Sequence, residues 1–154
     1  MRLYRIAKAA FARDVTGQGA AAYGGRWNHR GTFVLYTAES RALATVEYLV
    51  HVALPLAPGG LSLATLEVPD RCAIETVDPA SLPANWRAAP APARLADIGS
   101  AWAQAARTLL LRVPSAVVDQ EFNVLVNPAH PDAARLKLVR VEPCRLDERL
   151  LRRR

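Results

Sequence analysis

The amino-acid sequence predicts an α+β fold, with a mainly antiparallel β core and a few flanking helices. Segments rich in β-branched and aromatic residues cluster on both sides of two helix-like stretches. These strands and helices do not alternate as they do in parallel βαβ architectures. A chain of 154 residues, 51% of them hydrophobic, is long enough to bury a sizeable core. We therefore expect residues 1–154 to form a single domain.

The first part of the chain predicts two strands and one helix. Residues 3–7 (LYRIA) and 32–38 (TFVLYTA) are bounded by polar residues and glycine, which is typical of strands. Ser40 is a suitable N-cap for a helix that continues to about Ala53 and that Pro55 stops. This helix follows the second strand directly.

The rest of the chain predicts a strand pair, a loop, a second helix and three strands. Residues 61–68 and 72–77 are expected to pair, since only a short PDR segment separates them. The Pro/Ala-rich stretch 78–97 predicts a surface loop inside the domain, and the second helix is expected from about Ser100 to Leu110. The last expected strands are 113–118, 121–128 and 136–143.

The net charge of +6 and a pI near 10 raise the question of an anionic partner. Part of the excess lies in the last ten residues, RLDERLLRRR, which are typical of a solvated end. The other basic residues are scattered, without the interleaved aromatics of a nucleic-acid groove. We therefore expect no direct nucleic-acid binding, whereas a phosphorylated small molecule or an acidic protein partner is compatible with the charge.

No apolar run approaches the roughly 18 to 20 residues that a membrane-spanning helix needs. The N-terminal stretch MRLYRIAKAAFARD has no apolar block ending in a cleavage site, as a secretory signal would. Cys72 and Cys144 are too few and too isolated for a disulfide framework or a zinc site. A cytoplasmic protein without membrane association is the simplest expectation.

Glu47 lies on the apolar face of the first predicted helix. At about 100° per residue, it falls within one arc with Leu43, Val46 and Val50. A buried, ionised carboxylate is costly unless it is paired or hydrogen-bonded. Glu47 therefore either reaches solvent or an Arg at the edge of the stripe, or points into a cleft as an acid, a base or a cation stabiliser. Its position on the helix does not decide between the two.

Two other polar residues suit a binding site. Arg26 follows two glycines in GGRWN, where the backbone can approach a ligand closely and the guanidinium offers a planar fork for phosphate or carboxylate; a plain turn gives the same pattern. Ser115 follows a proline in an apolar segment, where its hydroxyl needs a partner, most simply a nearby backbone group. Neither a P-loop, nor GxGxxG, nor GxSxG is present, so nucleotide-binding Rossmann and serine-hydrolase sites lack support.

Together these segments resemble the RES domain, a family named for an Arg, a Glu and a Ser. GGRWN, VLYTAES, ALATVEYLVH, VPSAVV and NVLVNPAHPD carry the resemblance, which extends over nearly the whole chain. It implies an ADP-ribosyltransferase-like fold and the NAD-consuming toxin of a bacterial toxin–antitoxin pair. Arg26, Glu47 and Ser115 match the naming residues, Tyr36 matches an aromatic position in the NAD pocket, and Arg5 corresponds less closely.

The implied reaction breaks the nicotinamide–ribose bond of NAD through an oxocarbenium-like transition state. Glu47 would stabilise the developing positive charge or hold a ribose hydroxyl, and Arg26 would hold the pyrophosphate or a ribose-linked oxygen. Tyr36 would stack on the nicotinamide ring, and Ser115 would hydrogen-bond the nicotinamide ribose or amide. NAD is the substrate in this scheme, and neither a cofactor nor a metal is needed.

The acceptor of the ribose stays open. Water gives an NAD glycohydrolase, inorganic phosphate a phosphorylase, and a protein side chain an ADP-ribosyltransferase. Two other hypotheses are an RNA-cleaving toxin, in which His29, His51 or His130 converge, and a non-catalytic binding module. In the sequence the three histidines are far apart and do not have the spacing of metal ligands. The resemblance favours the NAD-consuming toxin, with the matched residues together in one deep pocket.

The resemblance also implies a partner, because an unrestrained NAD-degrading enzyme harms its own cell. We expect an Xre-type helix-turn-helix antitoxin that blocks the mouth of the pocket. A homodimer within the toxin–antitoxin complex is expected, with nucleic acid contacted only through the antitoxin.

Overall fold

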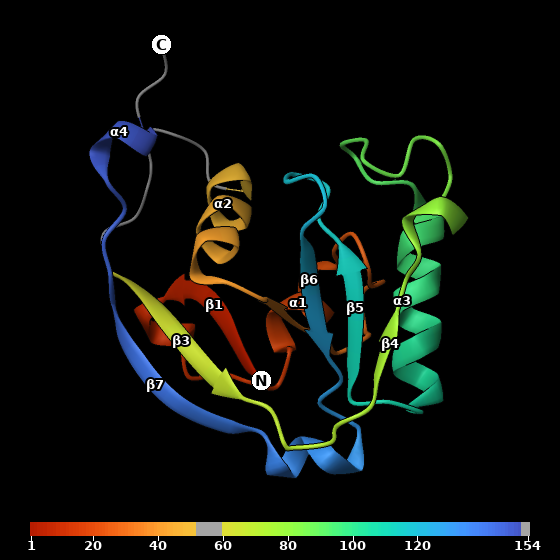
Figure 1. The fold of residues 1–154 in the computed structure, drawn as a ribbon, viewed down its shortest axis with the longest axis horizontal. Helices are drawn as coiled ribbons and strands as arrows, with labels where there is room; N and C mark the ends of the chain where they lie inside the picture. Colours follow the sequence, from red (N-terminus) through yellow and green to blue (C-terminus); the bar gives the residue numbers. More distant parts are fainter. Residues whose placement is uncertain (52–59, 152–154) are drawn as a thin grey trace.

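The computed structural model describes residues 1–51 and 60–151, and in this part of the chain seven strands form one sheet in the order β4-β5-β6-β2-β1-β3-β7 (Figure 1). The strands are β1 (Arg2–Lys8), β2 (Leu35–Ala38), β3 (Leu61–Glu67), β4 (Ile74–Thr76), β5 (Leu110–Pro114), β6 (Phe122–Val126) and β7 (Lys137–Cys144). The helices are α1 (Gln18–Tyr23), α2 (Arg41–His51), α3 (Ala93–Ala105) and α4 (Glu148–Leu151), with single 3₁₀ turns at Ala9–Phe11, Pro79–Ser81 and Pro131–Arg135. The mainly antiparallel α+β core is as predicted.

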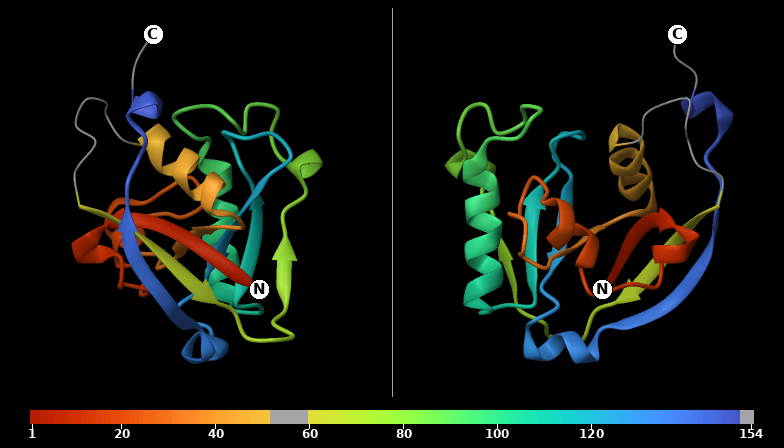
Figure 2. Two further views of the ribbon diagram at one scale, coloured as in Figure 1. Left: turned by 60° about the vertical axis from the view of Figure 1, so that its left-hand side comes forward. Right: turned by 180° about the vertical axis from the view of Figure 1, so that it is seen from behind.

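The sheet consists of two halves that are joined at one narrow point. β1 pairs with β3 along its full length, and β3 pairs with β7 in the same way. In the other half, β6 pairs antiparallel with both β2 and β5. A single residue pair, Tyr4 opposite Ala38, connects β1 to β2 across the two halves. Figure 2 shows the two halves diverging from this junction.

Helices cover the two halves separately. α2 packs on β1 and β2, and its Leu43 joins a buried cluster with Ile6 and Leu63. α3 packs on the other half, where Leu95 and Trp102 belong to one apolar cluster with residues of β5 and β6 (Figure 2). β3 is buried at all but its last residue, as its apolar sequence LSLATLE requires.

The predicted helix after Ser40 is confirmed at its start. The Ser40 hydroxyl accepts a hydrogen bond from the backbone N–H of Leu43 at 3.0 Å, which satisfies one free donor of the first turn. The expected stop near Ala53 and Pro55 lies outside the described residues. The preceding strand is shorter than predicted, because β2 begins at Leu35, where its pairing with β6 begins.

The predicted pairing of 61–68 with 72–77 is wrong. β3 lies between β1 and β7, whereas β4 forms the opposite edge of the sheet and pairs in parallel with β5. A parallel pair needs a crossover, and α3 provides it between β4 and β5. The chain therefore does contain one βαβ unit. The sequence pattern did not reveal it, because β4 is short and a long Pro/Ala-rich connection follows it.

The second helix and the strand after it were both predicted too far along the chain. α3 starts at Ala93, directly after Pro92, and ends where Ala106 takes a left-handed conformation with φ of 47°. Helix-forming Ala and Leu follow the last proline, so the C-terminal part of the predicted loop 78–97 is helical. β5 then begins at Leu110, because its apolar residues pair with β6, and it ends before Ser115.

Within residues 1–51 and 60–151, no helix combines the length and the apolar character that crossing a bilayer requires. Both cysteines are free thiols. The short helices α1 and α4 were not predicted, since neither exceeds six residues and neither carries a clear helical periodicity.

Candidate functional site

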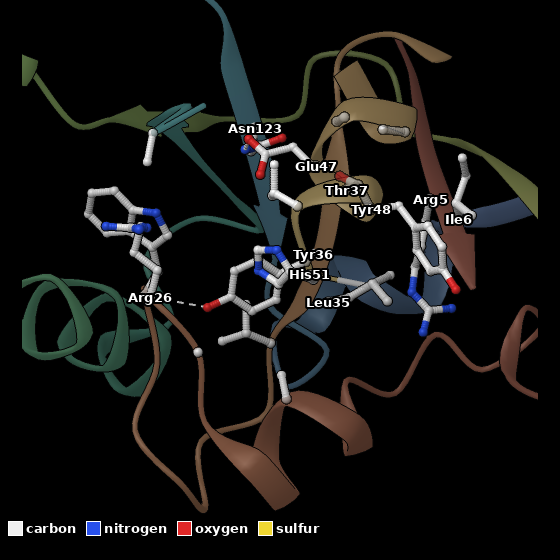
Figure 3. A pocket seen from close by; sticks show the side chains of 18 of the residues that line it. Arg5, Ile6, Arg26, Leu35, Tyr36, Thr37, Glu47, Tyr48, His51 and Asn123 are labelled. Carbon is white, nitrogen blue, oxygen red and sulfur yellow. Dashed lines mark hydrogen bonds between the residues drawn. The ribbon is translucent and has the colours of Figure 1, made fainter. Parts of the chain in front are cut away.

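A cavity of about 590 Å³ opens between the two halves of the sheet and below α2 (Figure 3). Its volume lies in the range of small-molecule sites, which is roughly 300 to 1,000 Å³. β1, β2, β6, α2 and the turn after α1 all contribute to its wall. The polar residues that matter for its chemistry are Arg5, Arg26, Tyr36, Glu47, Arg87 and Asn123.

Glu47 points from α2 into this cavity, so the structure favours the second interpretation of its place on the apolar stripe. Its Oε1 accepts hydrogen bonds from the Ser115 hydroxyl at 2.7 Å and from Asn123 Nδ2 at 2.6 Å. Hydrogen bonds to a carboxylate offset part of the cost of removing it from water. Two donors on the same oxygen also fix the direction in which the carboxylate points.

Ser115 lies behind Glu47 rather than on the cavity wall. The residue is 1% exposed, and its Oγ accepts hydrogen bonds from the backbone N–H groups of Val117 and Val118 at 3.1 and 3.0 Å. Its only hydroxyl proton is thus directed at Glu47. The structure brings Ser115 to the predicted site, but in contact with the carboxylate and not with the space that a ligand would fill.

Asn123 is a site residue that the sequence reasoning missed. It sits on β6 opposite both Ala38 of β2 and Val113 of β5, in the interior of the sheet. Asn is disfavoured in strands, so its presence in the apolar run FNVLV was an available signal. A polar amide in such a strand needs a partner, and here the partner is Glu47.

Tyr36 forms the floor of the cavity beside the glycine-rich turn. Its hydroxyl accepts a hydrogen bond from Trp27 N at 3.0 Å and donates one to Asn28 Oδ1 at 2.8 Å. Burial raises the pKa of Tyr36 to about 12, so the hydroxyl keeps its proton at neutral pH. A Cβ at Gly25 would lie 2.7 Å from the Tyr36 hydroxyl, which is why this position of GGRWN needs glycine.

Arg26 reaches across to the Pro/Ala-rich segment. Its Nη1 donates to the carbonyl of Trp86 at 2.7 Å, and its Nη2 donates to the carbonyl of Ala88 at 3.2 Å. Burial lowers the pKa of Arg26, while the nearby Glu47 carboxylate acts in the opposite direction. Arg26 therefore both adds positive charge to the cavity and holds this segment against it.

Arg5 stands on β1, on the other side of the cavity from Arg26 (Figure 3). Its Nη1 donates to the carbonyls of Phe11 at 3.0 Å and Asp14 at 3.4 Å. Burial lowers its pKa, and the Asp14 carboxylate partly opposes this effect. The structure thus brings four of the five predicted residues to the cavity wall and the fifth, Ser115, directly behind it.

The three histidines do not converge. His29 pairs with Asp97 of α3 at 2.7 Å, and the His130 ring nitrogen Nδ1 accepts a hydrogen bond from the backbone N–H of Asp132 at 3.1 Å. His51, at the end of α2, lines the cavity without the other two. Within residues 1–51 and 60–151, no three His, Cys, Asp or Glu side chains gather as metal ligands would.

Comparisons with known proteins agree on one family. The RES domain family model matches residues 2–147. The Prs ADP-ribosylating toxin of Sphingobium sp. (strain YBL2) is 42% identical over 154 residues, which are 99% of this chain and 96% of that protein. Toxin Res of Yersinia enterocolitica is 43% identical over 131 residues, covering 84% of this chain and 86% of its own length.

The fold is also that of a solved toxin. The M. tuberculosis MbcT–MbcA toxin–antitoxin complex contains a chain that superposes with a TM-score of 0.72 at 21% identity, over 93% of this chain and 83% of that one. This similarity and the family match support the predicted ADP-ribosyltransferase-like fold class. The chain therefore belongs to the RES-domain family of toxins.

Proposed function

We propose that this protein is an NAD-consuming toxin that cleaves the nicotinamide–ribose bond. The observation that carries the proposal is Glu47, a carboxylate fixed in a small-molecule cavity by two donors on Oε1. Both hydrogen bonds to this carboxylate from the described part of the chain end on that oxygen, which leaves Oε2 to face a ligand. A fixed negative charge in a partly water-excluded cavity suits a reaction that develops positive charge on a ribose.

The residues around Glu47 have complementary roles in this proposal. The Tyr36 ring stacks on the nicotinamide, since Tyr36 lines the cavity and its hydroxyl is already engaged by Trp27 and Asn28. Arg26 uses two of its five N–H donors on carbonyls and keeps three for a ribose or phosphate oxygen. Ser115, behind the cavity wall, acts as a positioning residue through Glu47. Asn123 lines the cavity, and its hydrogen bond to Glu47 gives it the same positioning role.

The acceptor in this proposal is water or inorganic phosphate, which gives NAD glycohydrolase or phosphorylase activity. Either reaction drains NAD and inhibits growth. ADP-ribosyl transfer to a protein is the second candidate, and one observation favours it. The 42% identical Sphingobium relative is named a Prs ADP-ribosylating toxin.

Product analysis tests the proposal. Purified full-length protein is incubated with NAD, first without and then with inorganic phosphate, and the products are identified by NMR. Free nicotinamide is the expected result: ADP-ribose alone means hydrolysis, and a phosphorylated ADP-ribose that needs added phosphate means phosphorolysis. Transfer of ADP-ribose from labelled NAD to purified Prs, seen as label on the protein, would support the second candidate.

A folded sample that releases no nicotinamide under any of these conditions would contradict the proposal and favour a non-catalytic binding module. RNA incubated in parallel gives the control for the RNA-cleaving alternative, which the separate surroundings of His29, His51 and His130 already disfavour. We expect the RNA to stay intact.

The proposal includes an antitoxin partner in the cytoplasm. The M. tuberculosis relative in fold was solved as a toxin–antitoxin complex, which supports a partner of that class. We propose an Xre-type antitoxin that covers the mouth of the cavity and so inhibits the enzyme. The toxin would form a homodimer within this complex. Co-purification with the product of an adjacent gene, followed by mass measurement and loss of NAD cleavage, tests the partner, the stoichiometry and the blocked site together.

A further inference from the structure

Residues 82–92 belong to the segment that the sequence predicts as a surface loop, and we call them the rim because Arg87 and Ala89 line the cavity. The segment stands at the same end of the molecule as the β5–β6 turn and the C-terminal end of α2 (Figure 1, Figure 2). The two hydrogen bonds from Arg26 to the carbonyls of Trp86 and Ala88 hold it there. The residue between these two carbonyls is Arg87, and its side chain lines the cavity.

Arg87 has a rigid support on one side and a weak partner on the other. Its guanidinium lies over the ring of Trp86, 4.5 Å from the centroid, and that Trp is only 8% exposed. Its ion-pair partner is Asp119 of the β5–β6 turn, at 2.5 Å, with a side chain that is 81% exposed. An exposed ion pair of this kind contributes roughly 0 to 1 kcal/mol, so another anion can replace Asp119 at little cost.

The other two arginines of the cavity are more firmly committed. Arg5 is hydrogen-bonded to backbone carbonyls and lies close to Asp14, which also lines the cavity. Arg26 holds the rim and interacts electrostatically with Glu47. Arg87 differs because its acidic partner, Asp119, is outside the cavity wall. Of these three arginines, Arg87 is therefore the one whose positive charge is not paired with a carboxylate of the cavity wall.

We propose that Arg87 is the pyrophosphate-binding residue of this site and that Asp119 competes with the ligand for its guanidinium. This inference rests on the proposed use of NAD. A guanidinium binds phosphate oxygens with paired, charge-assisted hydrogen bonds, and stacking on Trp86 holds its plane ready for them. Arg26 then serves the nicotinamide–ribose end beside Glu47 and Tyr36, and Arg87 serves the anionic middle of the dinucleotide.

The experiment separates pyrophosphate binding from turnover. Binding of ADP, which carries the pyrophosphate without nicotinamide, is measured by calorimetry for the wild type, Arg87→Ala and Asp119→Asn. Adenosine, which has no phosphate, is the matched probe. Arg94→Ala removes the same charge from an exposed site on α3 outside the cavity wall and serves as the control variant.

We expect Arg87→Ala to weaken ADP binding about 10- to 100-fold, the usual effect of losing hydrogen bonds to a charged group, without changing adenosine binding. Asp119→Asn should tighten ADP binding about 1.5- to 5-fold, the range of an exposed ion pair. The KM for NAD should follow the ADP affinity in each variant, with kcat within about 3-fold of wild type, as for a uniformly binding contact.

Equal ADP affinity in the wild type and Arg87→Ala would overturn the inference, as would an equal loss in Arg94→Ala. Weakened adenosine binding in Arg87→Ala would overturn it too, because the effect would then come from a displaced rim. The proposed function fails separately, through a wild type that binds ADP but releases no nicotinamide. In that case the ADP titrations alone still decide whether Arg87 binds a pyrophosphate.

Discussion

The two walls of the cavity are built in different ways. The carboxylate wall is made by Glu47 of α2 and Asn123 of β6, and Ser115, directly after β5, supports it from behind. Side-chain hydrogen bonds from Ser115 and Asn123 to Glu47 connect the three residues. The arginine wall, made by Arg26 and the 86–88 segment that includes Arg87, stands on turns. Backbone carbonyls and one exposed ion pair hold it.

This difference indicates that the two walls have different roles in catalysis and in substrate binding. A group that stabilises a transition state must already point in the right direction, and regular elements joined by side-chain hydrogen bonds provide such rigidity. A group that binds the invariant parts of a substrate tolerates small movements, which turns allow. Changes in the carboxylate wall should therefore lower kcat, whereas changes in the arginine wall should raise KM.

Replacing Glu47 should have the largest effect. Glu47→Gln keeps the size of the side chain but removes the charge that the proposed oxocarbenium-like transition state needs. We expect kcat for nicotinamide release to fall about 100- to 1,000-fold, as for other preorganised electrostatic groups, with little change in ADP affinity. Glu39→Gln, at a surface carboxylate paired with Arg112, is the matched control and should retain activity. A folded Glu47→Gln enzyme with wild-type kcat would remove the basis of the proposed mechanism.

Asn123→Ala should give the next largest effect and test whether the carboxylate wall depends on positioning. The change removes the 2.6 Å hydrogen bond to Glu47 Oε1 but leaves the carboxylate in place. We expect kcat to fall about 10- to 100-fold at nearly constant KM, since a hydrogen bond to a charged group is lost. Asn123→Gln or Asn123→Ser, which retain a donor, should recover part of the loss. A rise in KM without a fall in kcat would place Asn123 in substrate binding instead.

The carboxylate wall was easier to predict from the sequence than the arginine wall. A carboxylate on an apolar helix face is a local anomaly, so helical periodicity singled out Glu47 as a candidate, although it did not decide whether the side chain points into a cleft. Ser115 was named from the sequence, but its contact with Glu47 was not, and Asn123 was missed, because 68 and 76 residues separate them from the carboxylate. The place of Ser115 behind the cavity wall follows from the end of β5 at Pro114, which the predicted strand 113–118 missed.

The arginine wall depends on contacts that leave little trace in the sequence. Arg26 donates to the backbone carbonyls of residues 86 and 88. Every residue has such a carbonyl, so the amino-acid types at these positions do not indicate the contact. The Pro/Ala-rich composition indicated a loop but not its place at the cavity. The same composition hid the start of α3 and, with it, the crossover that makes β4 and β5 parallel.

Tyr36 lies between the two walls, and its titration should show how well the floor of the cavity excludes water from the Tyr36 hydroxyl. Burial raises its pKa from 10.0 to about 12 in the folded protein. The protonated hydroxyl is thus favoured in the folded state, and this contribution is fully present below pH 10. It is lost as the pH rises from about 10 through about 12, which should lower the free energy of unfolding by about 2 kcal/mol.

Urea unfolding of the wild type and Tyr36→Phe across this pH range measures the effect. The loss of stability between pH 10 and 12 should be smaller in Tyr36→Phe, whatever the stability of the variant at neutral pH. Tyr23→Phe, at a side chain that is 81% exposed, is the matched control and should keep the wild-type slope. Parallel curves for the wild type and Tyr36→Phe would mean that solvent reaches the hydroxyl.

Arg26→Lys should have the smallest effect and decides to which wall Arg26 belongs. An ammonium keeps the positive charge near Glu47 but cannot span the carbonyls of Trp86 and Ala88 as the guanidinium fork does. We expect the KM for NAD to rise about 5-fold, equivalent to about 1 kcal/mol for one lost hydrogen bond, with kcat nearly unchanged. Faster protease cleavage within residues 82–92 should accompany the change, whereas Arg30→Lys, on the same turn but off the cavity wall, should show neither effect. A fall in kcat without faster cleavage would instead show that Arg26 stabilises the transition state together with Glu47 rather than only binding the substrate. The arginine wall would then consist of Arg87 alone.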